Sequence, residues 1–152
     1  MIVETLGNSE LLGLTKIGYF ASGTIASLSV LPTLDWATET AKRGEVAIVS
    51  GFQSKIEREV LGILLKGGCG IICVLARPIY KVIPDKFRTA FDMGRMLFIS
   101  NNTSKSTMTS RGICHRRNEY IASISDELVF SSVTPDSSLY SLTLSAKPVK
   151  TF

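Results

Sequence analysis

The chain has 152 residues, 45% of them hydrophobic and 20% charged, with a formal net charge of +4. This length suits one hydrophobic core, so we expect a single domain over residues 1–152. The apolar runs are too short to span a membrane and the first residues lack a signal-peptide pattern, which makes the cytoplasm the expected location. Three cysteines without a CxxC pair and a single histidine give too few ligands of suitable spacing, so neither a metal site nor a cofactor is predicted.

Positive charge is concentrated in one part of the sequence. Residues 77–117 hold nine Lys and Arg residues against two Asp residues, which gives this stretch +7 and leaves −3 for the rest. Such an excess attracts phosphates or nucleic acid and releases their counterions on binding. A solvated basic face without a ligand is the alternative interpretation.

Short apolar runs alternate with segments of helical period along the chain. Strands are expected at residues 17–21, 46–49, 70–75, 96–99 and 127–131, and helices at about 31–42, 54–66, 85–93 and 117–125. The first helix would hold Pro32 in its first turn, residues 100–112 would form a long polar loop, and the tail after Pro135 fits either helix or strand. The alternation predicts a Rossmann-like three-layer α/β/α fold with a mainly parallel sheet of about five or more strands.

The expected turns after the strands carry small, hydroxylic or basic residues. Ligands of open parallel sheets bind beyond the carboxyl ends of the strands, where glycine lets the main chain approach a phosphate and guanidinium groups add directional bonds. The candidates for binding nucleic acid or phosphate in and beside these turns are Ser22, Gly23, Ser50, Gly51, Lys55, Arg77 and Arg111. Each also has a purely structural interpretation, because Gly and Ser commonly make turns.

The run His115-Arg116-Arg117-Asn118 adds two guanidinium groups and an amide at the expected start of the last helix. Positive side chains oppose the positive end of a helix dipole unless an anion lies nearby. We therefore add Arg116, Arg117 and Asn118 to the candidate phosphate-binding residues. A local ion pair with Glu119 is the structural alternative.

The order of these motifs resembles the DNA-processing protein A (DprA, also called Smf) family over nearly the whole chain. Val49–Gly51 (VSG), followed by a helix, is similar to the family's Ser-Gly leader, and Arg117–Ser125 (RNEYIASIS) is similar to its RNRxIAGLS signature. The resemblance implies a divergent minimal core that binds single-stranded DNA in a basic pocket of a Rossmann-like domain and acts in DNA uptake and recombination. It also implies RecA as a partner and leaves a homodimer open. Carried over by position, Ser22, Ser50, Gly51, Arg117 and Asn118 would line the pocket.

Several positions depart from the family pattern. Gly23 stands where the first turn of the family has arginine, Ser54-Lys55 replace Arg-Gly, Glu57 replaces an aspartate and Glu119 replaces the second arginine of the signature. These changes remove charge-assisted phosphate contacts. Lys55, Arg77, Arg111 and Arg116 would compensate in part.

Three classes of function remain open. The favoured class is a DprA-like protein that binds single-stranded DNA, with affinity dominated by phosphates. A nucleotide-binding protein or a phosphoribohydrolase-like enzyme of a related fold is the second class, and a degenerate interaction module is the third. Catalysis is not expected, because the Pro-Gly-Gly-x-Gly-Thr loop of those hydrolases is absent and His115, the only imidazole, has no adjacent carboxylate.

Overall fold

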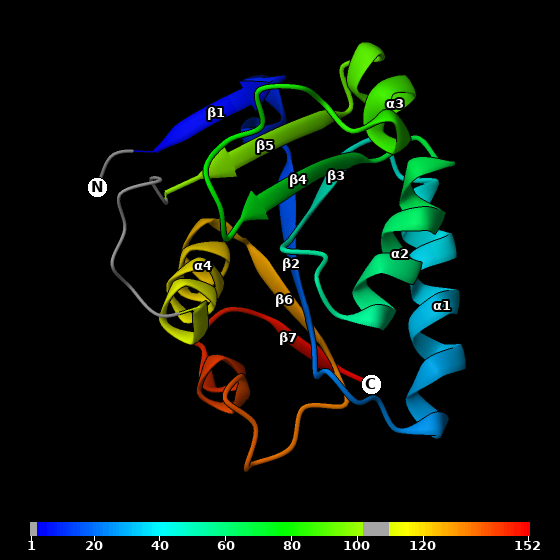
Figure 1. The fold of residues 1–152 in the computed structure, drawn as a ribbon. Coiled ribbons are helices and arrows are strands. Elements are labelled where there is room, and N and C mark those ends of the chain that lie inside the picture. The colour runs from blue at the N-terminus through cyan, green and yellow to red at the C-terminus, as the bar shows by residue number, and fades with distance from the viewer. Residues whose placement is uncertain (1–2, 102–109) are drawn as a thin grey trace.

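The structure is a computed structural model that describes residues 3–101 and 110–152, which contain one seven-stranded sheet (Figure 1). The strands are β1 (Glu4–Gly7), β2 (Thr15–Ala21), β3 (Val46–Ser50), β4 (Gly70–Leu75), β5 (Met96–Ser100), β6 (Glu127–Ser131) and β7 (Val149–Thr151). Their order is β1-β5-β4-β3-β2-β6-β7, and within this sheet β1 pairs antiparallel with β5 while the other pairs are parallel. The mainly parallel sheet expected from the sequence is confirmed.

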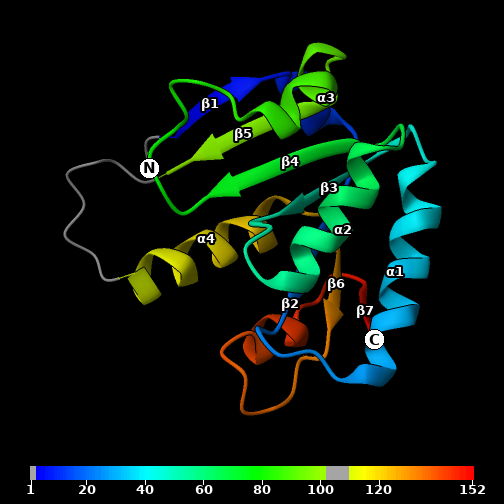
Figure 2. The ribbon, with the colours of Figure 1, turned by 45° about the vertical axis from the view of Figure 1, so that its right-hand side comes forward.

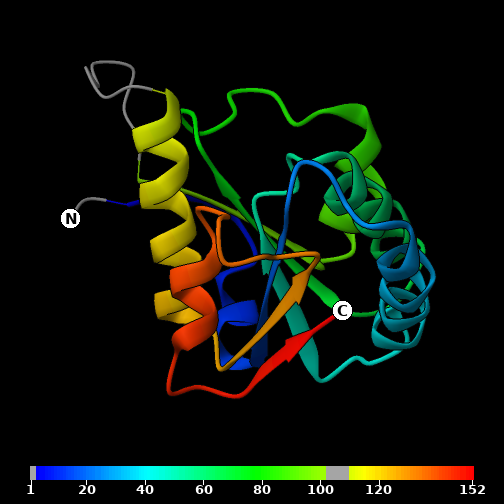
Figure 3. The same ribbon diagram turned by 90° about the horizontal axis from the view of Figure 1, so that it is seen from below.

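Helices cover both faces of the sheet. The α-helices are α1 (Ser27–Ala41), α2 (Lys55–Leu65), α3 (Arg88–Asp92) and α4 (Ser110–Ile124), and short 3₁₀ helices are η1 (Ser9–Gly13), η2 (Asp85–Phe87) and η3 (Tyr140–Leu144). Figure 3 shows α1, α2 and α3 on one side of the sheet and α4 with η3 on the other. The three-layer α/β/α architecture is therefore also as predicted. Within the described residues no helix is both long and apolar enough to cross a membrane.

The central strands are apolar because both of their faces are covered. Every residue of β3, β4 and β5 is buried, as expected for parallel strands between two helical layers. Alternate side chains of the strands pack into two hydrophobic cores, one under α1, α2 and α3 and one under α4. In the second core the rings of Phe20 and Phe130 stack with their centroids 5.1 Å apart.

The sheet is wider than the sequence predicted. β1, with four residues, and β7, with three, extend it at its two edges. Strands this short leave little periodicity to detect, and each is held by backbone bonds to a longer neighbour rather than by its own apolar pattern. The tail after Pro135, for which helix and strand were both open, contains η3 and β7.

Two helices begin earlier than expected. The first, α1, begins at Ser27, so Pro32 lies inside the helix and not in its first turn. The amide hydrogen that Pro32 lacks would have bonded to the carbonyl of Leu28, which is 90% exposed, so water can supply that bond.

The last helix, α4, begins at Ser110 and not at residue 117, so part of the expected loop is helical. Ser110 and Gly112 in its first turn are poor helix formers, which concealed the start of this helix in the sequence. Residues 102–109 of the expected loop lie outside the described residues. Arg116, Arg117 and Asn118 are therefore well inside the helix, and the argument from the positive helix end was wrong.

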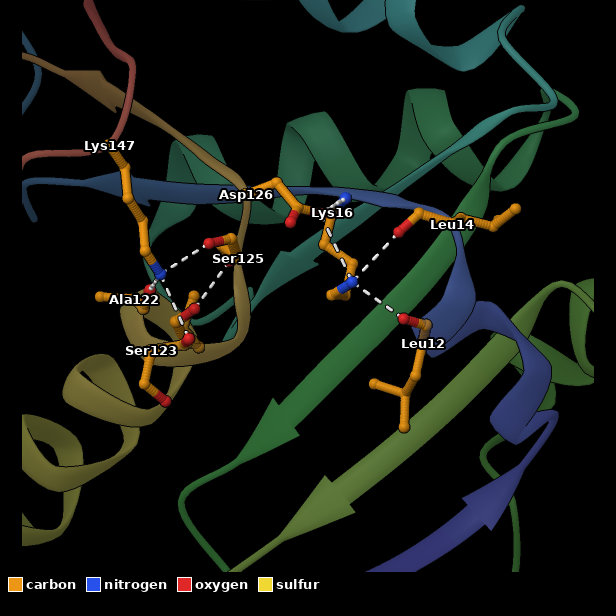
Figure 4. A network of polar contacts seen from close by, with 9 residues as sticks. Leu12, Leu14, Lys16, Ala122, Ser123, Ser125, Asp126 and Lys147 are labelled. Atoms are coloured by element: carbon orange, nitrogen blue, oxygen red, sulfur yellow. Dashed lines mark hydrogen bonds and ion pairs between the residues drawn. The ribbon is translucent and has the colours of Figure 1, made fainter.

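The C-terminal end of α4 is fixed by a half-buried lysine, Lys147. Lys147 Nζ donates hydrogen bonds to the carbonyl oxygens of Ala122, Ser123 and Ser125 at 2.6, 3.2 and 2.7 Å (Figure 4). The carbonyls of Ala122 and Ser123 belong to the last turn of the helix, where they have no partner within it, and Ser125 follows the helix end. A positive charge is favourable there. This contact fixes the position of the helix that carries the candidate Arg117.

The connection from α4 to β6 is held to the start of β2. The carboxylate of Asp126 accepts the backbone N–H of Lys16 at 2.7 Å, and Lys16 Nζ lies 3.4 Å from the same oxygen (Figure 4). The hydrogen bond from Lys16 is the main cause that lowers the pKa of Asp126. The N-terminal end of the parallel strand pair β2–β6 is thus held by polar contacts.

Candidate functional site

The side chain of Arg117 lies directly on the backbone at the end of β3. A Cβ atom placed on Gly51 would come 2.6 Å from Cζ of Arg117 and 2.7 Å from both Nε and Nη1. Real Cβ atoms do not approach other atoms so closely, so glycine at position 51 is what admits the guanidinium group. Arg117 is only 7% exposed.

The hydrogen bonds of this guanidinium group are incomplete. Nε and Nη2 donate to Oδ1 of Asn118 at 3.2 and 3.0 Å. Nη1 is buried and has no hydrogen-bond partner among residues 3–101 and 110–152, and no ion pair of Arg117 is found there either. A buried donor on a charged group without an acceptor costs about 1–3 kcal/mol or more. An anionic oxygen beside Nη1 would remove that cost, and because the atom is covered in this structure, a local movement must first open a path to it.

Cys73 on β4 lies close enough to Arg117 for the positive charge to affect the pKa of its thiol, but the thiol does not neutralise that charge. Burial raises the pKa of the Cys73 thiol to about 12, although the positive charge of Arg117 acts in the opposite direction. The thiol is therefore protonated at neutral pH and supplies no negative charge.

The turn that carries Gly51 is shaped by its neighbours. Ser50 is fully buried, and its Oγ accepts the backbone N–H of Phe52 at 3.2 Å. Phe52 has a left-handed backbone with φ of +50°, which is strained for a bulky residue, and its ring is buried in the core under α1 and α2. The buried hydroxyl of Ser50 thus holds the backbone of the turn in place.

Glu57 joins this turn to the end of β2. One carboxylate oxygen accepts the backbone N–H of Ala21 at 3.1 Å, and the other accepts those of Gln53 and Ser54 at 2.9 and 3.0 Å. Ser54 and Glu57 form a capping box at the start of α2. The sequence analysis treated Glu57 only as a family departure. The pattern Ser-x-x-Glu before an apolar run would have revealed the capping box, but the bond to Ala21 is tertiary.

A second polar cluster lies at the ends of β2 and β6. Ser22 Oγ donates to the carbonyl oxygen of Ser132 at 2.9 Å, and Ser132 has a left-handed backbone with φ of +55°. Ser131 Oγ lies 2.9 Å from Tyr19 Oη and 2.7 Å from Thr33 Oγ1, in a buried network. The sequence analysis did not select Ser131 and Ser132, although two hydroxyl residues at the end of a strand are a signal of the same kind as Ser22.

The other predicted site residues lie apart from the Arg117–Gly51 contact. Gly23 and Lys55 line a hollow of about 340 Å³ between the starts of α1 and α2. Arg77 is exposed after β4, where its guanidinium carbon lies 4.4 Å from the ring centroid of Tyr80. Arg111 and Arg116 are exposed on α4. The structure thus brings together Ser50, Gly51, Arg117 and Asn118 out of the predicted set.

Glu119 does not pair with either arginine. Its carboxylate lies 2.9 Å from Nε2 of His115, one helical turn earlier. The sequence analysis found no carboxylate beside His115, which was wrong because residues four apart meet on a helix surface. In the described part of the chain, no group of three His, Cys, Asp or Glu side chains could hold a metal ion.

No protein-family model matches the sequence, and no curated protein matches it at a significant level. Solved structures do match in fold. DNA processing protein A (DprA) from Streptococcus pneumoniae aligns with a TM-score of 0.73 and 16% identity over 98% of this chain, which spans 54% of that structure. DprA from Helicobacter pylori, which binds single-stranded DNA, aligns with a TM-score of 0.74 and 17% identity. The alignment covers 98% of this chain and 70% of the H. pylori chain.

The molybdenum cofactor carrier protein from Chlamydomonas reinhardtii is a more distant match, with a TM-score of 0.57 and 18% identity over 91% of this chain and 76% of its own. At these identities the comparisons establish the fold. The chain has the Rossmann-like α/β fold of the DprA structures, which confirms at the level of the fold the resemblance seen in the sequence.

Proposed function

We propose that this protein binds single-stranded DNA through its phosphates, with Arg117 as the anchoring residue. One observation carries the proposal, namely the buried Nη1 of Arg117, which lacks an acceptor among the described residues. A phosphate oxygen supplies both the acceptor and the negative charge. The fold shared with DprA supports DNA as the source of that phosphate.

The exposed arginines would extend the contact along the DNA backbone. Arg77, Arg111 and Arg116 are exposed on the elements that follow β4 and form α4, and their charge attracts the strand at long range. Each phosphate that is neutralised on a single strand contributes about −0.7 to the slope of log K against log salt. With these three residues and Arg117 engaged, the slope would be about −3, so a doubling of the salt concentration would weaken binding roughly sevenfold.

The site favours binding over catalysis. It offers a guanidinium group, an amide and hydroxyl groups, and the nearby carboxylate of Glu57 is occupied by three backbone N–H groups. Roles in DNA uptake and recombination, RecA as a partner and a location in the cytoplasm are extensions of the proposal from the family resemblance.

A carrier of a small phosphorylated nucleotide is the second candidate. The Nη1 group of Arg117, unpaired among the described residues, suits one phosphate as well as it suits a strand. The likeness in fold to a cofactor carrier protein agrees with this alternative.

Fluorescence anisotropy with a labelled oligonucleotide of about 20 nucleotides, a length that exceeds one site of 4–16 nucleotides, tests the proposal. The native protein should bind in a salt-dependent manner, and Arg117→Met, which keeps the aliphatic stem, should weaken binding about tenfold or more. Arg88→Ala is the control, because Arg88 is exposed and its one ion pair among the described residues is with Asp92 on α3. Failure of the native protein to bind DNA at low salt would refute the proposal, and binding of a nucleoside monophosphate in its place would favour the carrier.

A further inference from the structure

A cavity lies between α1 and the outer strands β6 and β7. Figure 2 shows the end of β7 beside α1, and the ring centroids of Trp36 and Phe152 lie 6.2 Å apart there. The cavity has a volume of about 500 Å³. Its floor includes Ile17 of β2 and Val129 of β6, which belong to the core under α1. A ligand in the cavity would therefore cover apolar surface on one side.

The cavity is long in the direction of the strands. Glu127 and Phe152 both line it. In the pairing of β6 with β7, Phe130 lies opposite Thr151. Phe152 is therefore level with Ser131, which is four residues beyond Glu127. Four residues of a strand span about 13 Å. A cavity of this length favours a linear ligand over a compact one.

Aromatic rings and an ammonium group already meet in the wall of the cavity. Trp36 and Phe152 are both half-buried and both line it. Nζ of Lys150 lies 5.2 Å from the ring centroid of Phe152, a distance at which the face of a ring attracts a cation. The indole ring of tryptophan attracts cations most strongly. The wall is therefore suited to alkylammonium groups.

Two carboxylates line the cavity without a partner of opposite charge. Asp35 lines it from the helix, and Glu127 lines it from the first position of β6. Among residues 3–101 and 110–152, neither side chain forms an ion pair. Both are at least partly exposed, so a cation can reach them from solvent.

The other charged groups of the cavity leave this negative charge in excess. Arg43 pairs with Glu45 at 2.8 Å, and Glu39 pairs with Lys42 at 3.2 Å. In the described part of the chain, the two unpaired carboxylates then face one further lysine, Lys150. The charge of the cavity is thus complementary to a cation.

We propose that this cavity binds a linear aliphatic polyamine. Its ammonium groups would pair with Asp35 and Glu127, and its methylene chain would lie against the apolar floor and the ring of Trp36. The proposal does not depend on DNA binding, because Arg117 reaches the sheet from α4, on the opposite face (Figure 3).

Isothermal titration calorimetry with spermidine, without DNA and at constant ionic strength, tests the proposal. Ion pairs at exposed positions and cation–π contacts are each weak, so the dissociation constant should be about 0.01–1 mM. Trp36 is the only tryptophan, and its fluorescence should change with the same midpoint. Heptane-1,7-diol, which is linear but uncharged, and Mg²⁺, which is charged but compact, should bind about tenfold more weakly or less.

Two conservative variants test the carboxylates. Asp35→Asn and Glu127→Gln should each weaken spermidine binding about threefold, and the double variant should weaken it about tenfold. Glu59→Gln is the matched control, because Glu59 is exposed on α2, outside this cavity. Thermal melts of the variants would show that each one is folded at the temperature of the titration.

Lys150→Met should have the opposite effect. It removes a positive charge that repels the ligand, so spermidine should bind about threefold more tightly. A purely structural role of the cavity residues would not produce tighter binding.

The absence of heat and of a fluorescence change with the native protein, up to about 5 mM spermidine, would overturn the proposal. Binding that Asp35→Asn and Glu127→Gln leave intact would also overturn it, because the amine would then bind elsewhere. Mg²⁺ binding as tight as that of spermidine would do the same, since charge alone would then explain the contact.

Discussion

Replacement of Gly51 by alanine tests whether the Arg117 contact constrains the site. The new Cβ would lie 2.6 Å from Cζ of Arg117, so the guanidinium group must move and its two bonds to Asn118 must change. Overpacking of a tight site costs about 1–3 kcal/mol. In a chain of this size, that loss corresponds to a fall in melting temperature of roughly 2–12 °C.

Urea denaturation of a double-mutant cycle measures the effect. Gly51→Ala should cost about 1–3 kcal/mol in the native chain but close to zero in an Arg117→Ala background, because the group that it displaces is then absent. The coupling between the two changes should therefore exceed about 1 kcal/mol. Additivity of the two changes within about 0.5 kcal/mol would refute the reasoning.

Three further predictions concern the surroundings of the site. In a urea titration, Glu57→Gln should lower the free energy of unfolding by about 2 kcal/mol, because a charged acceptor of backbone N–H groups is lost. The control Glu59→Gln, at an exposed position, should leave the free energy of unfolding unchanged. Gly62→Ala should raise the melting temperature by about 2–4 °C, since the added Cβ meets nothing and the helix gains about 1 kcal/mol; a fall would show that the space beside Gly62 is filled. Cys114, which is partly exposed, should react with an aromatic disulfide reagent at pH 8 while Cys73, whose pKa is raised to about 12, should not. Mass spectrometry of the labelled native protein would identify the modified thiol, and rapid labelling of Cys73 would contradict its burial.

The sequence analysis selected Arg117 for a reason that the structure replaces. It placed the residue at a helix start, where a bound anion would relieve the helix dipole, but Arg117 lies inside α4, which begins at Ser110. The case for an anion now depends on the unpaired Nη1. Whether a donor is buried and unpaired depends on atoms brought together by the fold, so no local pattern could show it.

The fold brings some of the predicted site residues into contact and leaves others apart. Gly51 and Arg117 are 66 positions apart and in direct contact. Gly23 and Lys55 instead share a hollow with Thr24 and Ile25. Turn chemistry identifies residues near the carboxyl edge of the sheet, but the order of the strands and the position of α4 decide which of them meet.

The α/β alternation, the five main strands and the three-layer class could all be predicted from the sequence, because apolar runs and helical period are local properties that burial on both faces imposes. The sequence also indicated the carboxyl edge as the place of the site, since parallel strands end there. The edge strands β1 and β7, the start of α4 at Ser110 and the contact between Arg117 and Gly51 could be seen only in the folded chain. Each of these depends on backbone pairing or on side-chain contact between segments far apart in the chain, and such contacts leave no periodic trace in the sequence.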